Sequence, residues 1–217
     1  MAASEGRRYG GASAAERRAD RRERLIRAAV ALYGEHGYRR TTVAAVCRAA
    51  GLTPRYFYEA FENSEALLAE TFREVGEVVL RHVADAAAAV DGPAEDRLAA
   101  MWTAYYDLLR EQRATARVFL LEVAGIDAAV DALFAESMTA FAALIVRTID
   151  PAGGTDTVHP LAATGTMHGL LAIARSWVAG DCATPVAEVV RVVMPLCLLL
   201  APPHAAGTPA AAIRSGS

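Results

Sequence analysis

The chain has 217 residues, a length that suits one large domain or a small domain joined to a larger one. Its 49 alanines supply much of the 54% apolar composition, and because alanine is the strongest helix former, this composition favours helices over sheets. No apolar run approaches the length of a membrane span, and no secretory signal precedes the first helix. The three cysteines are too far apart for a zinc knuckle or a disulfide framework. We therefore expect a cytoplasmic protein without membrane contact.

The two parts of the chain differ in charge. Residues 1–64 contain twelve arginines and seven acidic residues, whereas residues 65–217 contain ten arginines and eighteen acidic residues. We attribute the complete absence of lysine to overall composition. The surplus of positive charge in residues 1–64 nevertheless indicates a polyanionic partner for that part of the chain.

The first helix is predicted to follow a flexible basic arm. Residues 1–20 combine Gly, Ser, Ala and Arg without apolar periodicity, and their arginines either contact DNA or only improve solubility. The same alternatives apply to Arg22 and Arg24 just after the arm. From there onward apolar residues recur at helical spacing, and Gly34 with Gly37 provides a stop signal.

Two short helices are predicted next. Thr41 or Thr42 caps a helix of about nine residues, and the following Gly51 suits a left-handed turn. Thr53, followed by a proline, opens a third helix that runs to about Phe61. The inward face of the first short helix consists of Val43, Val46, Cys47 and Ala50.

The remainder of the chain is also predicted to be helical, which makes the fold class all-α. A long fourth helix, capped by Asn63 or Ser64, carries an apolar stripe until the Asp-Gly-Pro sequence at 91–93 ends it. No alternating strand pattern is present, and the tail at 201–217 is expected to be disordered because it is rich in Ala, Pro and Gly. Further helices are expected at about 94–112, 114–124, 126–149, 159–179 and 185–200.

The two short helices around the glycine turn, supported by the first helix, have the spacing of a helix-turn-helix. On a helical wheel Phe57 and Phe61 share one face and would anchor the third helix, so Arg55 and its neighbours would face the bases. Tyr58 either contacts phosphate or lies at the edge of the core. The DNA-binding candidates, which read bases or contact phosphates, are Arg39, Arg40, Thr41, Thr42, Thr53, Arg55, Tyr56, Tyr58 and Glu59.

Residues 25–68 resemble the DNA-binding region of tetracycline-repressor (TetR) type transcriptional regulators. The matching features are the Ala-Ala pair and aromatic residue of the first helix, the Gly-Tyr-x-x-Thr-Thr-Val and Ala-Gly-Leu-Thr sequences, the Tyr-x-x-Phe sequence of the third helix and the Glu-x-Leu-Leu opening of the fourth. The resemblance implies an N-terminal three-helix helix-turn-helix domain at 21–67 and a C-terminal helical ligand-binding and dimerisation domain at 68–200. The chain departs from the family at Ala60 and Ser64, where the family usually has residues that meet DNA phosphates.

The resemblance also implies a small-molecule pocket in the second domain. Aromatic and methionine residues there have the spacing of a helical core, so packing is the default role for each of them. Because amphipathic aromatic side chains are the available lining, we expect a mostly apolar effector. For His168, ligand contact and a buried role satisfied by the backbone both stay open. The ligand-binding candidates are Trp102, Tyr105, Tyr106, Phe119, Phe141, His168 and Trp177.

We further predict a homodimer through the last two helices, at about 159–200, because their apolar stripes exceed what one copy is expected to bury. A two-fold dimer implies a near-palindromic DNA site. The stripes consist of Leu161, Leu170, Leu171, Ala174 and Trp177 on one helix and of Val186, Val189, Val190, Val193 and Leu196 on the other.

These patterns together predict a ligand-responsive transcriptional regulator. We predict a repressor, which binds a double-stranded DNA operator and releases the operator when an effector tilts the long fourth helix. An activator is a lesser possibility. The alternative is a helical small-molecule-binding or partner-regulated protein in which DNA contact is secondary. The sequence contains no catalytic motif, no cofactor-binding motif and no metal-ligand spacing, so we expect neither an enzyme nor a metal or cofactor.

Overall fold

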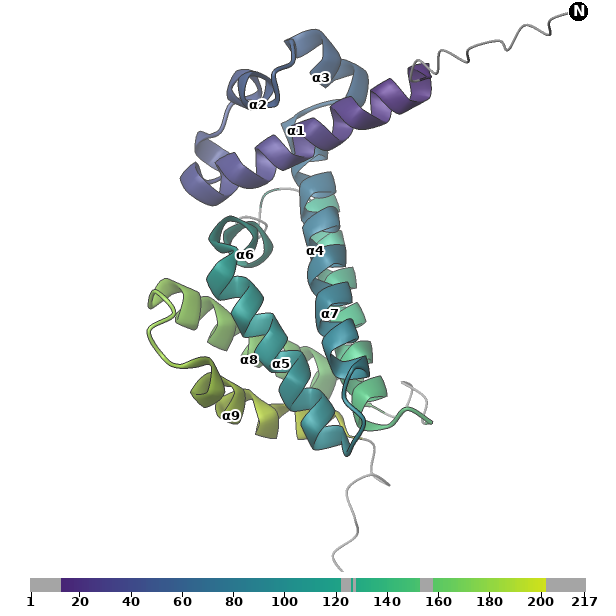
Figure 1. Ribbon diagram of the computed structural model, residues 1–217, viewed down its shortest axis with the longest axis vertical. Coiled ribbons are helices and arrows are strands. Elements are labelled where there is room, and N and C mark those ends of the chain that lie inside the picture. Colours follow the sequence, from purple (N-terminus) through teal and green to yellow (C-terminus); the bar gives the residue numbers. More distant parts are fainter. Residues whose placement is uncertain (1–12, 122–125, 127, 153–157, 202–217) are drawn as a thin grey trace, which may run out of the picture.

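The computed structural model describes residues 13–121, 126, 128–152 and 158–201. Over these residues every regular element is a helix, which confirms the all-α fold class. The helices α1 to α3 form a small group at one end of a larger bundle, and α4 runs from the first into the second (Figure 1). The elements are α1 (Ala14–His36), η1 (Tyr38–Arg40), α2 (Val43–Ala50), α3 (Pro54–Ala60), α4 (Ser64–Ala88), α5 (Ala94–Glu111), α6 (Arg113–Leu120), α7 (Ala128–Ile149), α8 (Pro160–Ala179), α9 (Val186–Cys197) and η3 (Leu198–Leu200).

Helix α1 begins earlier than predicted. The Ser13 hydroxyl accepts a hydrogen bond from the Glu16 N–H at 3.1 Å, and the Glu16 carboxylate accepts one from the backbone N–H of Ser13. The flexible-arm prediction is therefore wrong for residues 13–20, because a capping box and two alanines, Ala14 and Ala15, start a helix without any apolar periodicity. Residues 1–12 of the predicted arm and residues 202–217 of the predicted tail lie outside the described residues.

Gly34 is not a stop signal. It lies inside α1, which ends instead at Gly37, where the glycine N–H donates to the carbonyl oxygen of Tyr33 at 2.9 Å. A Cβ at position 34 would lie 2.3 Å from the Cα of Ala114 in α6, much closer than two carbons can approach. Gly34 is therefore the point at which the backbone of the small helical group touches the backbone of the larger bundle.

Arginines of α1 hold the ends of the two short helices. Gly51 ends α2 in the left-handed region, with φ at 64°, as predicted. Arg24 donates from Nε and Nη2 to the carbonyl oxygen of Ala50, at 3.1 and 2.6 Å, and Arg22 donates to the carbonyl oxygen of Ala60 at 3.1 Å. The expectation that these two arginines either contact DNA or only improve solubility is thus corrected: each one satisfies carbonyl groups at a helix end.

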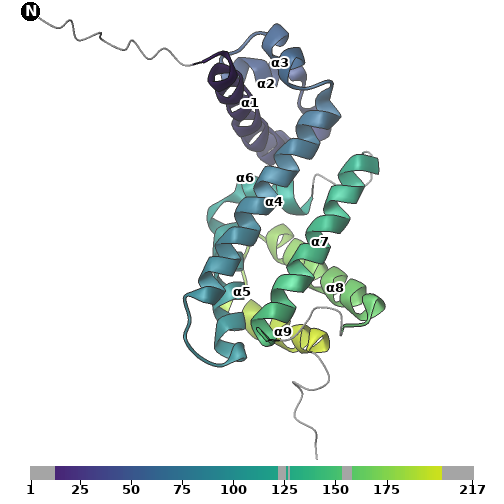
Figure 2. The same ribbon diagram turned by 90° about the vertical axis from the view of Figure 1, so that its right-hand side faces the viewer.

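Helix α4 connects the small group to the bundle without a break. Asn63 caps it, because its side-chain oxygen accepts from the Ala66 N–H at 2.7 Å. At 25 residues the helix is roughly 37 Å long. It packs against α1 near its start and against α5 and α7 farther along (Figure 2). A tilt of α4 would therefore be felt in both parts of the molecule.

Helix α7 is long and apolar enough, by length and composition alone, to cross a membrane. Core helices pass the same test. In this structure α7 packs against α4, α5 and α8, buries Phe141 and Ile145, and carries the charged residues Asp131 and Arg147. We therefore describe it as a helix of the bundle.

Candidate DNA-binding surface and effector cavity

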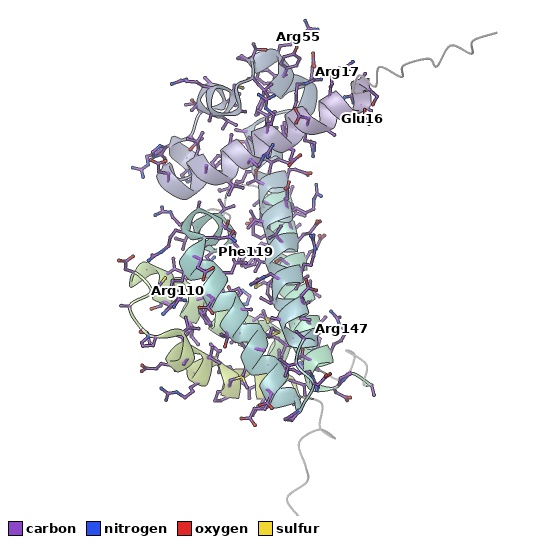
Figure 3. All side chains as sticks on the ribbon, in the orientation of Figure 1. Glu16, Arg17, Arg55, Arg110, Phe119 and Arg147 are labelled. Atoms are coloured by element: carbon purple, nitrogen blue, oxygen red, sulfur yellow. The ribbon has the colours of Figure 1, made fainter. Side chains whose placement is uncertain are left out.

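Helix α3 presents an exposed polar face because its aromatic residues anchor the opposite one. Phe57 is fully buried and Phe61 is 4% exposed, with ring centres 5.8 Å apart, as the helical wheel predicted. On the other side the Arg55 side chain is 84% exposed and points away from the rest of the molecule at the outer end of the small domain (Figure 3). Tyr58 is 63% exposed, so it is not a core-edge residue. Both side chains are accessible to a partner.

Three of the predicted base-reading residues form one contact network with α1. The Nε of Arg55 lies 3.0 Å from a carboxylate oxygen of Glu59, one turn later in the helix. Arg21 of α1 lies 3.9 Å from the same carboxylate, and its guanidinium carbon is 4.5 Å from the centre of the Tyr56 ring. To donate to a guanine, Arg55 must exchange Glu59 for the base. Exposed ion pairs contribute little free energy, so this exchange costs little.

The three threonines predicted to contact DNA differ in what they bond. The Thr42 hydroxyl accepts from the Ala45 N–H at 3.2 Å and caps α2. The Thr41 hydroxyl donates to the carbonyl oxygen of Gly37 at 2.9 Å. Thr53 is exposed and, among the described residues, its hydroxyl makes no capping bond with α3. Because no capping bond with α3 holds it, the Thr53 hydroxyl can turn to a phosphate without releasing the end of its helix.

Arg39 and Arg40 lie at the junction of the two parts of the molecule. Both are exposed, and Arg40 donates from Nε to the carbonyl oxygen of His36 at 2.8 Å. Together with Arg117 of α6 they line a hollow of about 260 Å³. The structure thus gathers positive charge beside the last turn of α1, and a contact of Arg39 or Arg40 with DNA stays a prediction.

Ser64 has a structural partner where the resemblance leads one to expect a phosphate-contacting lysine. The Tyr38 hydroxyl donates to the Ser64 Oγ at 3.2 Å, which joins η1 to the start of α4. Burial, the leading cause, raises the pKa of the Tyr38 phenol, so the hydroxyl keeps its proton and remains a donor. At this position the chain therefore has a serine that bonds Tyr38 within the small domain, in place of the positively charged lysine that the resemblance leads one to expect.

A small apolar cavity of about 20 Å³ lies in the larger domain, between α5, α6, α7 and α8. Phe119 of α6 points into the interior of the domain (Figure 3). A cavity needs about 10–15 Å³ to hold one water molecule, so this one is too small for an organic ligand as it stands. Four predicted ligand-binding residues line it, together with residues that the sequence assigned to the core or the dimer surface: Trp102, Tyr105, Phe119 and Phe141, then Met138, Met167, Leu170 and Leu171.

Contacts with neighbouring side chains orient the aromatic residues of this cavity. Trp102 donates from Nε1 to the sulfur of Cys197 at 3.0 Å, and burial raises the pKa of that thiol to about 11, so the sulfur stays a neutral acceptor. Tyr105 contacts Trp102 and Phe141 edge to face, with ring centres 5.4 and 6.2 Å away. Burial also raises the pKa of the Tyr105 hydroxyl. The lining of the cavity therefore consists of aromatic rings and uncharged side chains, which suits an apolar ligand.

The other three predicted ligand-binding residues lie elsewhere. Tyr106 is fully buried behind the cavity, and its ring packs against that of Trp177 with centres 5.1 Å apart. Trp177 lines a separate groove between α8 and α9. Its indole N–H donates to the carbonyl oxygen of Thr184 at 2.8 Å. Neither side chain lines the small cavity, and a contact of either one with a ligand stays a prediction. His168 is exposed rather than buried, and its Nδ1 lies 2.8 Å from the carbonyl oxygen of Thr164.

The apolar stripes predicted to form the dimer interface are used inside one copy of the chain. Helix α9 packs against α5 and α8, a contact that periodicity along the sequence does not reveal. Of the named residues only Leu161 is strongly exposed, at 76%, and the argument from surplus apolar area is therefore wrong. The buried ones are Leu170, Leu171, Ala174, Trp177, Val186, Val189, Val190 and Val193.

The fold and these sites define a class: a helix-turn-helix DNA-binding domain joined by one long helix to an all-helical domain with an aromatic cavity. Residues 25–71 match the family described as bacterial regulatory proteins, tetR family. The predicted resemblance is confirmed: residues 25–71 are similar to the DNA-binding domain of TetR-type transcriptional regulators. Among the described residues, no group of three or more His, Cys, Asp or Glu side chains is arranged to hold a metal ion.

Solved structures share the fold along most of the chain. The fatty acid degradation regulator FadR from Bacillus halodurans superposes with a TM-score of 0.67 at 22% identity, covering 83% of this chain and 94% of that one. The transcriptional regulator FadR from Bacillus subtilis, in complex with stearoyl-CoA, gives 0.66 at 20% identity over 82% and 97%. A tetR-family transcriptional regulator from Streptomyces coelicolor gives 0.66 at 18% identity over 84% and 80%. No curated protein sequence matches the chain.

Proposed function

We propose that this protein is a cytoplasmic, ligand-responsive transcriptional repressor. It binds a near-palindromic DNA operator as a homodimer and releases the operator when a small, mostly apolar molecule occupies the larger domain. The observation that carries the proposal is the outer face of α3: Arg55 and Tyr58 are exposed on a helix that Phe57 anchors, in a domain that matches the tetR family.

The chemistry of that face suits the major groove. The planar guanidinium of Arg55 can donate two hydrogen bonds to the O6 and N7 of a guanine, which identifies the base. The exposed hydroxyls of Tyr58 and Thr53 are suited to phosphate oxygens, which fix the position of the helix but carry no sequence information. Arg55 would thus identify one base pair, while phosphate contacts that DNA of any sequence provides would hold α3 in position.

Helix α6 supports a coupling between cavity and DNA. Phe119, near one end of α6, lines the cavity, and Ala114, near the other, meets Gly34 of α1 in the close approach described above. Because the cavity is too small for an organic ligand, binding must displace its walls, and a displaced Phe119 would shift α6 against α1. A preference of about 1–3 kcal/mol for the displaced state would weaken operator binding 5- to 150-fold, and by linkage the operator would weaken ligand binding equally.

The expected effector is mostly apolar. The cavity wall of rings and methionines supports this, and so does the fold that the chain shares with the B. subtilis regulator whose structure holds stearoyl-CoA. A ligand with a long apolar part would gain the most from such a lining, since each buried methylene group contributes about 0.8 kcal/mol.

For the dimer we propose the outward faces of α8 and α9. Added Cβ atoms at Gly165 and Gly169 would meet nothing within 4 Å, so this side of α8 is open, and Val192 of α9 is 55% exposed. A two-fold pairing there would place the two α3 helices about 34 Å apart, or a multiple of that, to match successive turns of DNA. A Val192→Glu variant should sediment as a monomer and lose operator binding, whereas a variant that stays dimeric would contradict the assignment of this face.

The proposed function is tested by titrating the DNA upstream of the protein's own gene, and a scrambled sequence, at two salt concentrations. Arg55→Ala should weaken binding to the native DNA by about 1–3 kcal/mol and relax preference at one base pair. Arg39→Ala should weaken both DNAs about equally and reduce the salt dependence. Equal losses on both DNAs for Arg55→Ala would refute a base-reading role, and failure of the unsubstituted protein to prefer its own upstream DNA would refute the proposed function.

A further inference from the structure

Each oxygen of the Glu59 carboxylate has its own guanidinium neighbour. Oε1 lies 3.0 Å from the Nε of Arg55, one turn earlier in α3. Oε2 lies 3.9 Å from Nη2 of Arg21, which belongs to α1. When Arg55 turns to a base, it therefore frees one oxygen of the carboxylate, while the other oxygen keeps its neighbour. The two guanidinium groups are thus not interchangeable partners of Glu59.

Arg21 has a second contact with α3, which keeps it beside Glu59. Its guanidinium carbon lies 4.5 Å from the centre of the Tyr56 ring, within the range of a cation–π interaction. Tyr56 and Glu59 are three residues apart, so they are neighbours on one side of α3. The Arg21 side chain is 22% exposed, whereas that of Arg55 is 84% exposed. Arg55 is therefore the partner that can leave the carboxylate, and Arg21 is the partner that stays.

A carboxylate on a face that meets DNA needs a counter-charge. In the free protein Glu59 is exposed to water, so its ion pairs contribute little free energy. Against a duplex, which carries one negative charge per about 1.7 Å of its axis, the same carboxylate faces phosphates. Among the described residues, the ion-pair partners of Glu59 are Arg21 and Arg55 alone. Once Arg55 bonds a base, the positive charge beside the carboxylate has to come from Arg21.

The freed oxygen of Glu59 is suited to a base. In the major groove a Glu carboxylate accepts from the N4 amino group of cytosine, and an Arg fork donates to the O6 and N7 of guanine. Arg55 and Glu59 are four residues apart, a rise of about 6 Å along α3. Successive base pairs are about 3.4 Å apart, so the two side chains would reach base pairs one or two steps from each other.

We propose that Arg21 is a positioning residue for sequence recognition. It stays with Glu59 and Tyr56 when Arg55 moves to a guanine, so that Glu59 accepts a hydrogen bond from a cytosine one or two base pairs away. The inference rests on the proposed function, because it requires α3 to enter the major groove. It adds a second base-reading residue, the base that this residue selects, and a residue of α1 that acts on recognition through α3 and not through DNA.

A double-mutant cycle tests the positioning role. The probe is a duplex that the unsubstituted protein selects from a pool of random sequences. Arg21→Gln should weaken binding to this duplex about tenfold, a coupling within the range of residues in contact. In the Glu59→Gln background the same change should weaken binding less than about twofold, because the carboxylate that needs Arg21 is gone. Equal losses in the two backgrounds would overturn the proposal, since Arg21 would then act on the phosphates directly.

A matched control separates the contact from the charge. Arg27→Gln removes the same unit charge from α1, where Arg27 pairs with Glu23 of its own helix, and it should weaken binding less than about twofold. A loss as large as that of Arg21→Gln would mean that net charge alone is at work, which also overturns the proposal. Urea unfolding shows whether each variant is folded. Should Arg21→Gln not fold, the base preference of Glu59→Gln, which keeps Arg21, still decides.

Repeating the selection with each variant tests the base that Glu59 reads. The guanine read by Arg55 is the one whose enrichment Arg55→Ala abolishes, and a cytosine should be enriched one or two base pairs from it. Glu59→Gln should keep the guanine and replace the cytosine by adenine, because Gln bonds adenine through two hydrogen bonds. An unchanged cytosine in Glu59→Gln would overturn the inference.

The failure of this inference is distinct from that of the proposed function. If the unsubstituted protein enriches no sequence from the pool, the proposed function fails. If it enriches a sequence, but Glu59→Gln enriches the same one, this inference fails alone and the repressor stands.

Discussion

The two parts of the molecule are held together by different kinds of contact. In the small domain, charged side chains of α1 reach backbone carbonyls at the ends of α2 and α3, as Arg24 and Arg22 do. In the larger domain, aromatic rings pack on one another, and a small cavity is left among them. The difference fits their proposed tasks: a domain that presents a rigid face to DNA benefits from fixed helix ends, and one that admits a ligand benefits from adaptable walls.

The largest effect is expected from Phe57→Ala. This fully buried ring is the anchor of a seven-residue helix, so its loss should lower the free energy of unfolding by about 3–5 kcal/mol and abolish DNA binding. Urea unfolding followed by circular dichroism measures it. The matched control is Tyr58→Ala on the same helix, which is 63% exposed and should leave stability nearly unchanged while weakening DNA binding. Similar losses of stability in the two variants would mean that α3 is not anchored as described.

A second pair of variants tests the contact between the two parts. At Gly34 an added methyl group would lie 2.3 Å from the Cα of Ala114, so Gly34→Ala must push α1 away from α6 and should cost about 1–3 kcal/mol. At Gly76 of α4 an added methyl would meet the Phe119 ring at 3.7 Å, an ordinary contact. Gly76→Ala should therefore raise stability by about 0.5–1 kcal/mol, through the better helix propensity of alanine.

Thermal or urea unfolding measures the stabilities of Gly34→Ala and Gly76→Ala. Operator titrations with and without ligand show whether ligand binding still weakens operator binding in each variant. If Gly34→Ala left both stability and coupling intact, the approach of α1 to α6 would not be the junction that we describe. The comparison is useful because both glycines lie inside helices, so their difference measures packing and not backbone freedom.

The small domain was largely predictable from sequence because its elements begin and end at residues with special backbone chemistry. Thr42, Gly51 and the Thr53-Pro54 pair marked the short helices, and the spacing of Phe57 and Phe61 marked the buried face of α3. What could not be predicted were contacts between elements distant in sequence. The sequence does not distinguish an arginine that bonds a carbonyl group 26 residues away, as Arg24 does, from an arginine that contacts DNA.

The larger domain was predictable only as a set of helices. Apolar spacing gave their approximate bounds, but it could not say which apolar face meets which helix. Leu170 and Leu171 were therefore assigned to a dimer surface, although they line the cavity, and Tyr106 was assigned to the cavity, although it lies behind it. Helical periodicity identifies a buried face without identifying its neighbour, and in a bundle with several candidate neighbours that choice depends on the three-dimensional arrangement.

A third, smaller effect concerns the arginines of α1. Arg24→Ala removes two hydrogen bonds to the last carbonyl group of α2, and because the side chain is partly exposed we expect a loss of about 1–2 kcal/mol. Arg27→Ala, three residues later, removes only an exposed ion pair with Glu23 and should change stability by less than about 0.5 kcal/mol. Both are measured by urea unfolding. Equal effects would show that the helix-end contact of Arg24 adds nothing beyond its charge.

The smallest effect compares one tyrosine hydroxyl from each part. The Tyr38 hydroxyl donates to Ser64, whereas the Tyr106 hydroxyl is buried and, among the described residues, has no hydrogen-bond partner. Removing a bonded hydroxyl costs about 0.5–1.5 kcal/mol, while removing a buried unbonded one relieves a desolvation cost. Tyr38→Phe should therefore lower the free energy of unfolding, and Tyr106→Phe should leave it unchanged or raise it by up to about 1 kcal/mol. Because the two substitutions delete the same atom, their difference isolates the contact. An equal loss in both would mean that the larger domain satisfies its polar groups as fully as the small one does, and the contrast between a fixed presenting domain and an adaptable receiving domain would then have to rest on the cavity alone.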